Sequence, residues 1–286
     1  MAIGTFDGVH LGHRRVLETA LETGLPVRVV TLNPHPRTVV QGNLVEFLTT
    51  LERRLELIQE LGVDETVVLD FTPERARQEP EEFAAAELEG ASVVVAGADF
   101  RFGHRRRGDL ELLERLGYEV RAVPLLAGVS SSEIRRRLHA GEVREAARLL
   151  GRPPEVDGIV VPGDQRGGTL GYPTANLAVE PALLVPRFGI YAGQALGHRA
   201  AISIGTNPHY GGEERRIEPY LLDFDGDLYG RRLIVELWER LRDEQAFESE
   251  QALVEQIARD VEATREATRP GGAGWVRAGD APLDCP

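Results

Sequence analysis

The sequence contains no lysine, so all 33 of its basic residues are arginine. This absence excludes a phosphate-binding P-loop, which requires a lysine. Arginine and protonated histidine remain as the cationic partners for phosphate. The single cysteine, Cys285, excludes an intrachain disulfide. No apolar run approaches the length of a membrane span, and we expect no signal peptide and a cytoplasmic location.

Charge of positive sign is also scarce. The formal net charge is −13 at pH 7, and acidic residues outnumber arginine in both halves. This balance disfavours duplex nucleic acid and anionic membranes as partners. The length of 286 residues and the hydrophobic content of 42% suit about two domains. We expect no nucleic-acid or membrane partner, and a homo-oligomer stays open.

A glycine-rich turn joins an apolar stub to a helical pattern near the start of the chain. His10 and His13 are three residues apart at the helix start, so they share one helix face. The helix N-terminus supplies free N–H groups and partial positive charge, and Gly8 and Gly12 permit close backbone approach. Such a histidine pair is more often incidental. Its place at the first strand-to-helix turn favours a cradle for nucleotide phosphates.

Valine-rich strands alternate with helices through the first half, which is typical of a parallel, doubly wound sheet. The expected strands are 27–32, 66–70, 92–96 and 119–123, and the expected helices are 51–61, 80–88 and 109–116. A capping box at Ser130 and Glu133 predicts another helix, and one more is expected over 142–150.

After Gly151 the strands become short and helices are rare, which predicts an antiparallel barrel. The expected strands are 158–161, 189–196, 200–204, 217–222 and 232–237. Asp225-Gly226 predicts a hairpin between the last two. A helix over 248–265 carries an apolar stripe that we expect to dock on the barrel, and 270–286 is expected to be a disordered tail.

Several strings resemble signature blocks of one family, the bacterial bifunctional riboflavin kinase/FMN adenylyltransferases, also called FAD synthetases. The blocks are GTFDGVHLGH at 4–13, NPHP at 33–36, GADFRFG at 97–103, SSSEIR at 130–135 and GDQRGGTLGYPTAN at 163–176. The resemblance implies a Rossmann-like nucleotidyltransferase domain over 1–150. It also implies a small antiparallel β-barrel riboflavin kinase domain with a C-terminal helix over 151–269.

For the first domain, the resemblance implies transfer of the AMP group of ATP to FMN, giving FAD and pyrophosphate. A phosphate monoester is already anionic at neutral pH, so this step needs no general base. The implied catalytic residues are His10 and His13. The implied ATP-binding residues are Gly4, Phe6, His10, Gly12, His13, Asp99, Ser131, Ser132 and Arg135.

For the second domain, the resemblance implies phosphorylation of riboflavin by ATP with Mg²⁺. The riboflavin hydroxyl must lose a proton, and Glu218 is the implied catalytic base. Arg242 and Glu244 are implied flavin contacts, and Thr174 and Asn176 are implied metal ligands, although both are also ordinary turn residues. The implied ATP-binding residues of the kinase are Gly163, Gly171, Tyr172, Pro173, Thr174 and Asn176.

Two departures from the family pattern keep alternatives open. Glu133 stands where the family usually has arginine, and family members usually carry about a dozen residues before the Gly4 block. A chain with riboflavin kinase activity alone and an impaired first domain is therefore the main alternative. A flavin-binding module without catalysis and a nucleotidyltransferase with another acceptor are the others.

Overall fold

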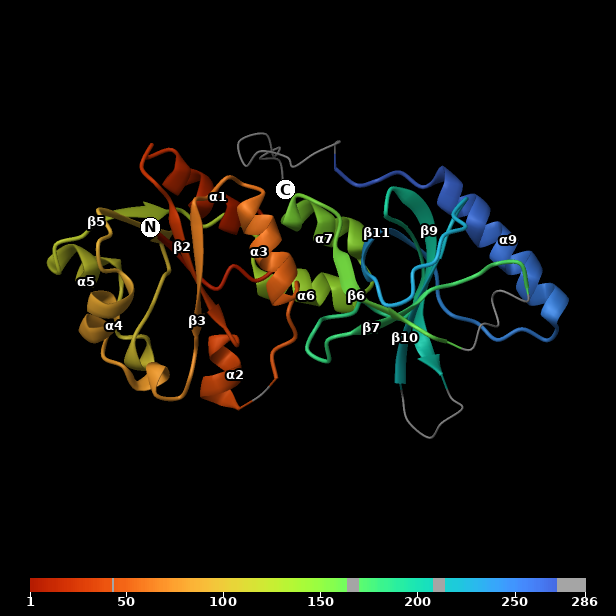
Figure 1. Cartoon of the computed structure of the whole chain (residues 1–286), viewed down its shortest axis with the longest axis horizontal. Coiled ribbons are helices and arrows are strands. Elements are labelled where there is room, and N and C mark those ends of the chain that lie inside the picture. The colour runs from red at the N-terminus through yellow and green to blue at the C-terminus, as the bar shows by residue number, and fades with distance from the viewer. Residues whose placement is uncertain (43, 164–169, 208–213, 272–286) are drawn as a thin grey trace. The chain divides into compact units, whose positions relative to one another are not determined.

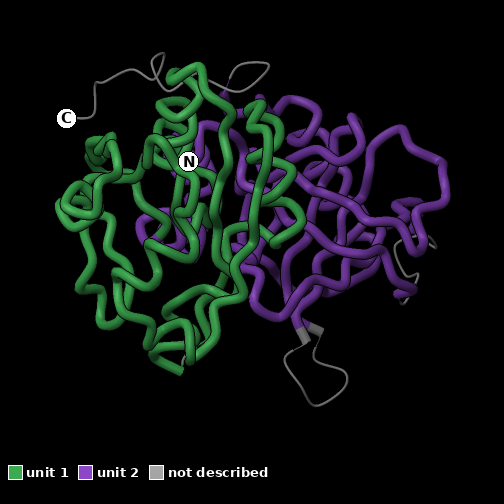
Figure 2. The backbone as a smooth tube through the Cα atoms, turned by 60° about the vertical axis from the view of Figure 1, so that its left-hand side comes forward, with its two compact units in different colours: residues 1–131, 278–286 green, residues 132–277 purple. Residues whose placement is uncertain are grey.

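The computed structural model describes residues 1–42, 44–163, 170–207 and 214–271. They form two compact units that divide between Ser131 and Ser132 (Figure 2). A parallel sheet forms the centre of the first unit, and an antiparallel sheet forms the second (Figure 1). No helix in the described ranges has the length and apolar character needed to cross a membrane. Most of the expected tail lies outside the described residues.

The first unit confirms the doubly wound parallel sheet, with strand order β3-β2-β1-β4-β5. The strands are β1 Ala2–Ile3, β2 Arg28–Asn33, β3 Glu65–Asp70, β4 Val93–Gly97 and β5 Glu119–Val123. The chain runs outward from β1 to β3 and then returns to the other side of β1. The switch point therefore lies between β1 and β4, where sheets of this kind bind ligands at their carboxyl ends.

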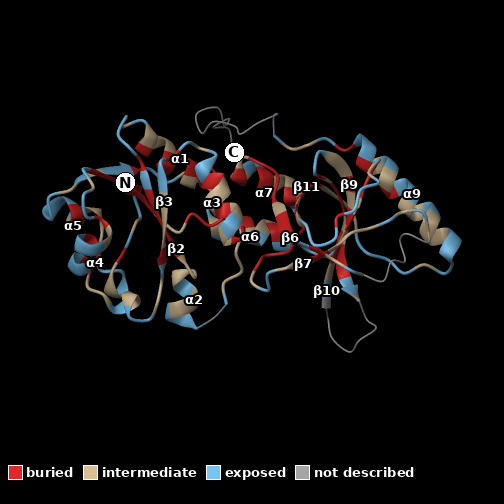
Figure 3. Ribbon diagram, in the orientation of Figure 1, coloured by how far each residue is buried: buried red, intermediate tan, exposed pale blue. Residues whose placement is uncertain are grey.

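The central strands of this sheet, β2 and β4, are buried on both faces beneath the helices, whereas the edge strands β3 and β5 are partly exposed. Val94 and Ala96 pack in one cluster with Phe83, while Val95 on the opposite face is also fully buried. Figure 3 shows the buried residues along these strands. The helices are α1 Leu11–Leu21, α2 Pro36–Gln41, α3 Leu51–Gln59, α4 Pro80–Glu87 and α5 Leu110–Arg115.

The second unit contains the expected antiparallel barrel, with strand order β10-β9-β8-β11-β6-β7. The hydrogen bond from the Ala175 N–H to the Pro219 carbonyl, 2.9 Å long, brings the two edges of the sheet together. The strands are β6 Glu155–Val161, β7 Asn176–Val179, β8 Gly189–Ala195, β9 His198–Asn207, β10 Glu214–Leu221 and β11 Arg232–Arg242.

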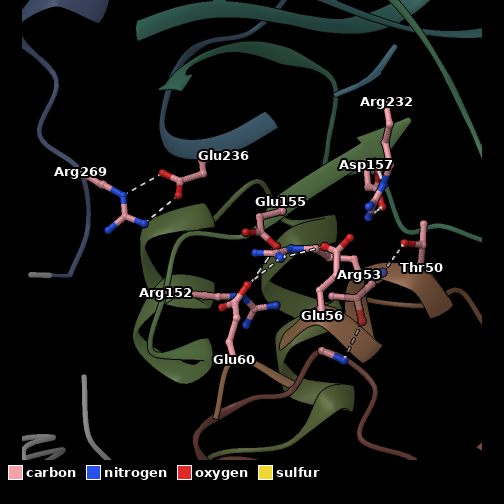
Figure 4. Close-up of polar contacts among 12 residues, drawn as sticks. Thr50, Arg53, Glu56, Glu60, Arg152, Glu155, Asp157, Arg232, Glu236 and Arg269 are labelled. Carbon is pink, nitrogen blue, oxygen red and sulfur yellow. Dashed lines mark hydrogen bonds and ion pairs between the residues drawn. The ribbon is translucent and has the colours of Figure 1, made fainter. Parts of the chain in front are cut away.

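Helix α9, Glu250–Glu266, packs on β8 and β9, which confirms the expected docking of the last helix. Two ion pairs connect β11 to its surroundings. Arg232 binds Asp157 at 2.7 Å, and Arg269 binds Glu236 at 2.7 Å (Figure 4). The segment after α9 is thereby fastened to β11.

The prediction of a hairpin at Asp225-Gly226 is wrong. Strand β11 pairs with β8 and β6, and β10 pairs with β9, so the chain between them connects strands that are not neighbours. The chain turns at Leu222-Asp223 instead, and a short turn signal does not say which strand the chain joins next. The sequence also missed β7 and the short helix α2.

The compact units divide earlier than the expected domain boundary at 150. Helices α6, Ser131–His139, and α7, Val143–Leu150, lie between the two positions. Their contacts explain the division, because the Arg187 N–H donates to the Leu138 carbonyl at 3.0 Å and α7 packs on β11. The functional boundary at 150 stays a prediction.

Candidate active sites

The glycine-rich turn between β1 and α1 has a strained backbone. Phe6 and Val9 have φ angles of 48° and 39°. These values lie in the left-handed region, where a β-branched residue such as Val9 is a genuine outlier. The surroundings hold the turn, since Thr31 Oγ1 donates to the Thr5 carbonyl at 3.0 Å. Strain that is maintained in this way marks the turn as a candidate functional site.

The two histidines predicted to act together are in contact. His10 is the N-cap of α1, and its Nδ1 accepts a hydrogen bond from the His13 N–H at 3.2 Å. Because Nδ1 accepts, a neutral His10 ring carries its proton on Nε2, which is then able to donate to an anion. The two imidazoles stack with centroids 3.6 Å apart, and Phe6 meets His13 edge-on at 5.4 Å.

The predicted glycines make room for these rings. A Cβ on Gly4 would lie 3.2 Å from the Phe6 ring, and a Cβ on Gly12 would lie 3.2 Å from His10 Cε1. Both distances are tighter than ordinary van der Waals contact between carbon atoms. Glycine at these positions therefore lets Phe6 and His10 lie directly against the backbone.

Two more predicted residues lie at the same edge of the parallel sheet. Asp99 is exposed in the turn that follows β4, next to the strand that precedes the histidine turn. Ser131 Oγ donates to the Asp7 carbonyl at 3.1 Å, which joins the serine-rich segment to that turn. The switch point of the sheet thus brings three of the predicted segments together.

Ser132 and Arg135 lie on α6 in the second compact unit, and their role at the first site stays a prediction. The neighbouring Glu133 is held on its own helix by Arg136 Nη2 at 2.5 Å and Arg137 Nε at 2.8 Å. The hydrogen bond from Arg136, followed by that from Arg137, lowers the pKa of Glu133 to about 2. Two arginines of the same helix therefore balance the negative charge that Glu133 introduces.

In the second unit, the Pro-Thr-Ala-Asn segment lies along β10. Each neighbouring strand pair of the sheet is antiparallel, and the five pairs from β10 to β7 make these two edges antiparallel as well. Ala175 bonds to Pro219, so Asn176 stands opposite Glu218, and Thr174 stands opposite Tyr220. The sheet therefore brings the predicted base and the predicted metal ligands to one face.

Glu218 lies on the polar face of β10. Ile217 and Leu221 on the other face are 1% and 4% exposed, whereas the Glu218 side chain keeps 28% of its exposure. Arg216 Nη1 is 3.5 Å from Glu218 Oε1 on the same strand face. A partly exposed carboxylate beside hydroxyl and amide groups is placed to accept a proton from an alcohol.

Gly163 leaves the space into which the Asn176 side chain extends. A Cβ on Gly163 would lie 2.0 Å from Asn176 Nδ2, a distance that no real contact shows. Tyr172 meets Tyr220 edge-on with ring centroids 5.4 Å apart, which fixes the turn before β7 on the barrel. Two other predicted ATP-binding residues are exposed in that turn, Gly171 and Pro173. Residues 164–169 of the signature lie outside the described residues.

Glu244 follows β11 and lies against β9. A Cβ on Gly205 would be 1.9 Å from Glu244 Oε1, and Gly205 pairs with Arg216 of β10. Glu244 is therefore one strand away from Glu218. Glu244 as a whole is exposed, but partial burial of its carboxyl group raises the pKa of Glu244; the charge of Arg242 acts against this rise, and the charge of Glu218 adds to it.

Arg242 is engaged in a structural contact. Its Nε and Nη2 donate to the Asp260 carboxylate at 2.9 and 2.7 Å, which fastens the end of β11 to α9. Its guanidinium also lies 5.9 Å from the centre of the Phe247 ring. A flavin contact by Arg242 stays a prediction.

Sequence reasoning gave no role to Gly205 or Arg54. Gly205 directly follows the expected strand over 200–204, but its close approach to Glu244 is visible only in three dimensions. Arg54 of α3 is buried beside the histidine turn. The signal was its spacing, because position 54 continues the buried stripe of Leu57 and Ile58.

A histidine turn at the switch point of a parallel sheet, with a glutamate on a separate antiparallel barrel, defines a two-domain nucleotide-dependent transferase. The family model described as FAD synthetase matches residues 1–134, and that described as riboflavin kinase matches residues 150–268. The chain belongs to the bifunctional riboflavin kinase/FMN adenylyltransferase family. It carries both domains, so the kinase-only alternative is not supported.

Relatives with that name match nearly the whole chain. The protein from Listeria monocytogenes is 36% identical over 93% of this chain and 91% of its own length. Those from Bacillus subtilis and Escherichia coli are 34% and 35% identical, over 91% and 93% of this chain and 89% and 91% of their own lengths. A crystal structure described as a macrolide-efflux protein from Streptococcus pneumoniae has a TM-score of 0.85 at 33% identity, covering 93% of this chain and 94% of that one.

Proposed function

We propose that the barrel domain converts riboflavin and ATP to FMN, and that the parallel-sheet domain converts FMN and ATP to FAD. The observation that carries the proposal is the placement of Asn176 opposite Glu218, which gathers the signature segment and a carboxylate on one face of the barrel. The family matches end at 134 and begin again at 150, which supports a functional boundary near 150.

In the kinase step, the 5′-hydroxyl oxygen of riboflavin forms a bond to the γ-phosphorus of ATP. The bond between that phosphorus and the bridging oxygen breaks, and ADP leaves. Glu218 takes the hydroxyl proton, because a neutral alcohol is a poor nucleophile. Glu244, seated on Gly205 one strand away, orients the flavin. Asn176 and Thr174 bind the phosphate end of ATP.

Mg²⁺ fits the same face of the barrel as part of the ATP complex. The Thr174 hydroxyl and the Asn176 amide oxygen are hard neutral ligands, and Mg²⁺ takes few protein ligands when phosphates supply the rest. In the described part of the chain, no group of three or more acidic, histidine or cysteine side chains is arranged to hold a metal. A bound Mg²⁺ would neutralise phosphate charge.

In the adenylyl step, an oxygen of the FMN phosphate forms a bond to the α-phosphorus of ATP, and pyrophosphate leaves. No proton has to be removed, so alignment and charge neutralisation carry the rate. His10 and His13 donate to the ATP phosphates from the start of α1, and Ser131, Ser132 and Arg135 bind their far end. Asp99 contacts the nucleotide at the switch point.

Chromatography of the products tests the proposal. The full chain is incubated with MgATP and either riboflavin or FMN. Riboflavin should give FMN first and FAD later, while FMN should give FAD and pyrophosphate. FMN that accumulates from riboflavin without any FAD would restore the kinase-only alternative. Absence of both products would reject the assignment, and other phosphate-bearing acceptors would then be tried in place of FMN.

A further inference from the structure

Arg54 is a buried cation beneath the histidine turn. It lies on α3, is 6% exposed, and its Nη1 donates to the Thr5 carbonyl at 2.7 Å and to the Leu32 carbonyl at 3.3 Å. Thr5 belongs to the turn after β1, and Leu32 lies near the carboxyl end of β2. One guanidinium therefore ties the turn to the neighbouring strand.

Burying this charge has a cost that its two hydrogen bonds and the nearby charge of Asp7 offset only in part. Both hydrogen bonds of Nη1 go to neutral carbonyl oxygens, and Nε is buried without a hydrogen-bond partner in the described residues. Burial lowers the pKa of Arg54, and the charge of Asp7 opposes this. An apolar side chain of similar size would often serve stability as well or better. Stability alone therefore does not require a cation at this position.

The turn above Arg54 needs to be held. Phe6, next to Thr5, and Val9 both have left-handed backbone. Asp7 Oδ1 accepts a hydrogen bond from the Leu48 N–H at 2.9 Å, so the segment that leads into α3 also binds this turn. Strain of this kind persists only where surrounding contacts over-determine the backbone.

We propose that Arg54 is a positioning residue for adenylyl transfer, which holds the histidine turn in its strained form and supplies a fixed positive charge beneath the polyphosphate of ATP. This inference rests on the proposed function of the first domain. A charge in a water-excluded position acts on phosphates more strongly than one in solvent, and it needs no reorganisation during the reaction.

Arg54→Met and Arg54→Lys test the proposal in the full chain. Arg15→Met is the matched control, because Arg15 of α1 is partly exposed and pairs with Glu22. FAD formation is measured from supplied FMN, and FMN formation from riboflavin reports on the kinase in the same protein. Arg54→Met should lower kcat/KM for ATP in FAD formation by about 100-fold. It should also raise the inhibition constant of pyrophosphate by about 10-fold. Arg15→Met and the kinase reaction should remain at the wild-type level.

The inhibition constant of pyrophosphate distinguishes loss of the Arg54 charge from loss of folded protein, because partial unfolding lowers the apparent kcat without changing that constant. Arg54→Lys keeps the charge but not both hydrogen bonds to the Thr5 and Leu32 carbonyls. It should therefore keep the wild-type inhibition constant of pyrophosphate and lower kcat by about 10-fold. If Arg54→Met does not fold, Arg54→Lys decides alone, and a wild-type kcat would overturn the proposal. An unchanged pyrophosphate constant in folded Arg54→Met would also overturn it. Wild-type protein that makes no FAD would instead overturn the proposed function.

Discussion

The carboxylate of Glu244 occupies the space that a side chain at Gly205 would fill. A Cβ built on Gly205 would lie 1.9 Å from Oε1 and 2.5 Å from Cδ of Glu244. Both residues belong to the barrel, and Gly205 faces Arg216 of β10, two residues before Glu218. The contact of Glu244 with β9 thus sets the distance between Glu244 and the proposed base, Glu218.

Gly205→Ala should displace Glu244 and weaken riboflavin phosphorylation. We expect the KM for riboflavin to rise by about 10-fold, which corresponds to the loss of about one good hydrogen bond. Steady-state kinetics of FMN formation measure it, and FAD formation from supplied FMN should not change. Glu244→Ala should give the same loss, and the double variant should lose no more than either single variant. Fully additive losses would show that Gly205 acts on something other than Glu244.

Glu244 should also make the empty barrel less stable at neutral pH. Its pKa is raised, mainly by partial burial of the carboxyl group and also by Glu218, against the influence of Arg242, and Arg216 of β10 pairs with Gly205 beside it. An acid with a raised pKa in the folded state binds protons more readily there than in the unfolded chain. Its charged form therefore destabilises the fold above that pKa, and the penalty disappears as the pH falls below the unfolded value of about 4.

Glu244→Gln removes this penalty. Thermal unfolding should show the variant to be more stable than wild type at pH 7, and the difference should shrink toward pH 4. Glu248→Gln, four residues further along the same segment and without the contact that Glu244 makes at Gly205, is the matched control and should show no such trend. A variant that loses stability at pH 7 would mean that the carboxylate serves the apo fold. Riboflavin phosphorylation should fall in Glu244→Gln even as stability rises.

The sequence predicted most helices and strands correctly, but it predicted few of the contacts between them. Valine runs predicted the parallel strands because valine favours extended backbone, at the buried strands β2 and β4 and at the partly exposed edges alike. Asp225-Gly226 misled because a turn signal does not say which strand follows β10 in the sheet. The placement of Asn176 opposite Glu218 depends on closure of the barrel through Ala175 and Pro219, which no local pattern encodes. Arg54 was missed because an arginine on a helix is ordinarily read as a surface residue.

His13→Ala should abolish most FAD formation and spare FMN formation. The variant removes a ring that stacks on His10 and contacts Phe6, and with it a proposed donor to the ATP phosphates. Loss of one donor of this kind lowers the rate by about 100-fold to 1,000-fold. Chromatography of the products formed from riboflavin and MgATP should show FMN that accumulates. Equal loss of both products would contradict independent sites.

Glu218→Gln should lower FMN formation and spare FAD formation. The amide keeps the shape and hydrogen bonding of the carboxylate but cannot accept the hydroxyl proton, so FMN formation should fall by at least about 100-fold. FAD formation from supplied FMN should persist, because the FMN phosphate already carries its nucleophilic charge and needs no base. Glu262→Gln on the exposed side of α9 is the matched control and should leave both reactions unchanged. If Glu218→Gln phosphorylates riboflavin at the wild-type rate, the base is another group and the assignment of the barrel face around Asn176 must be revised.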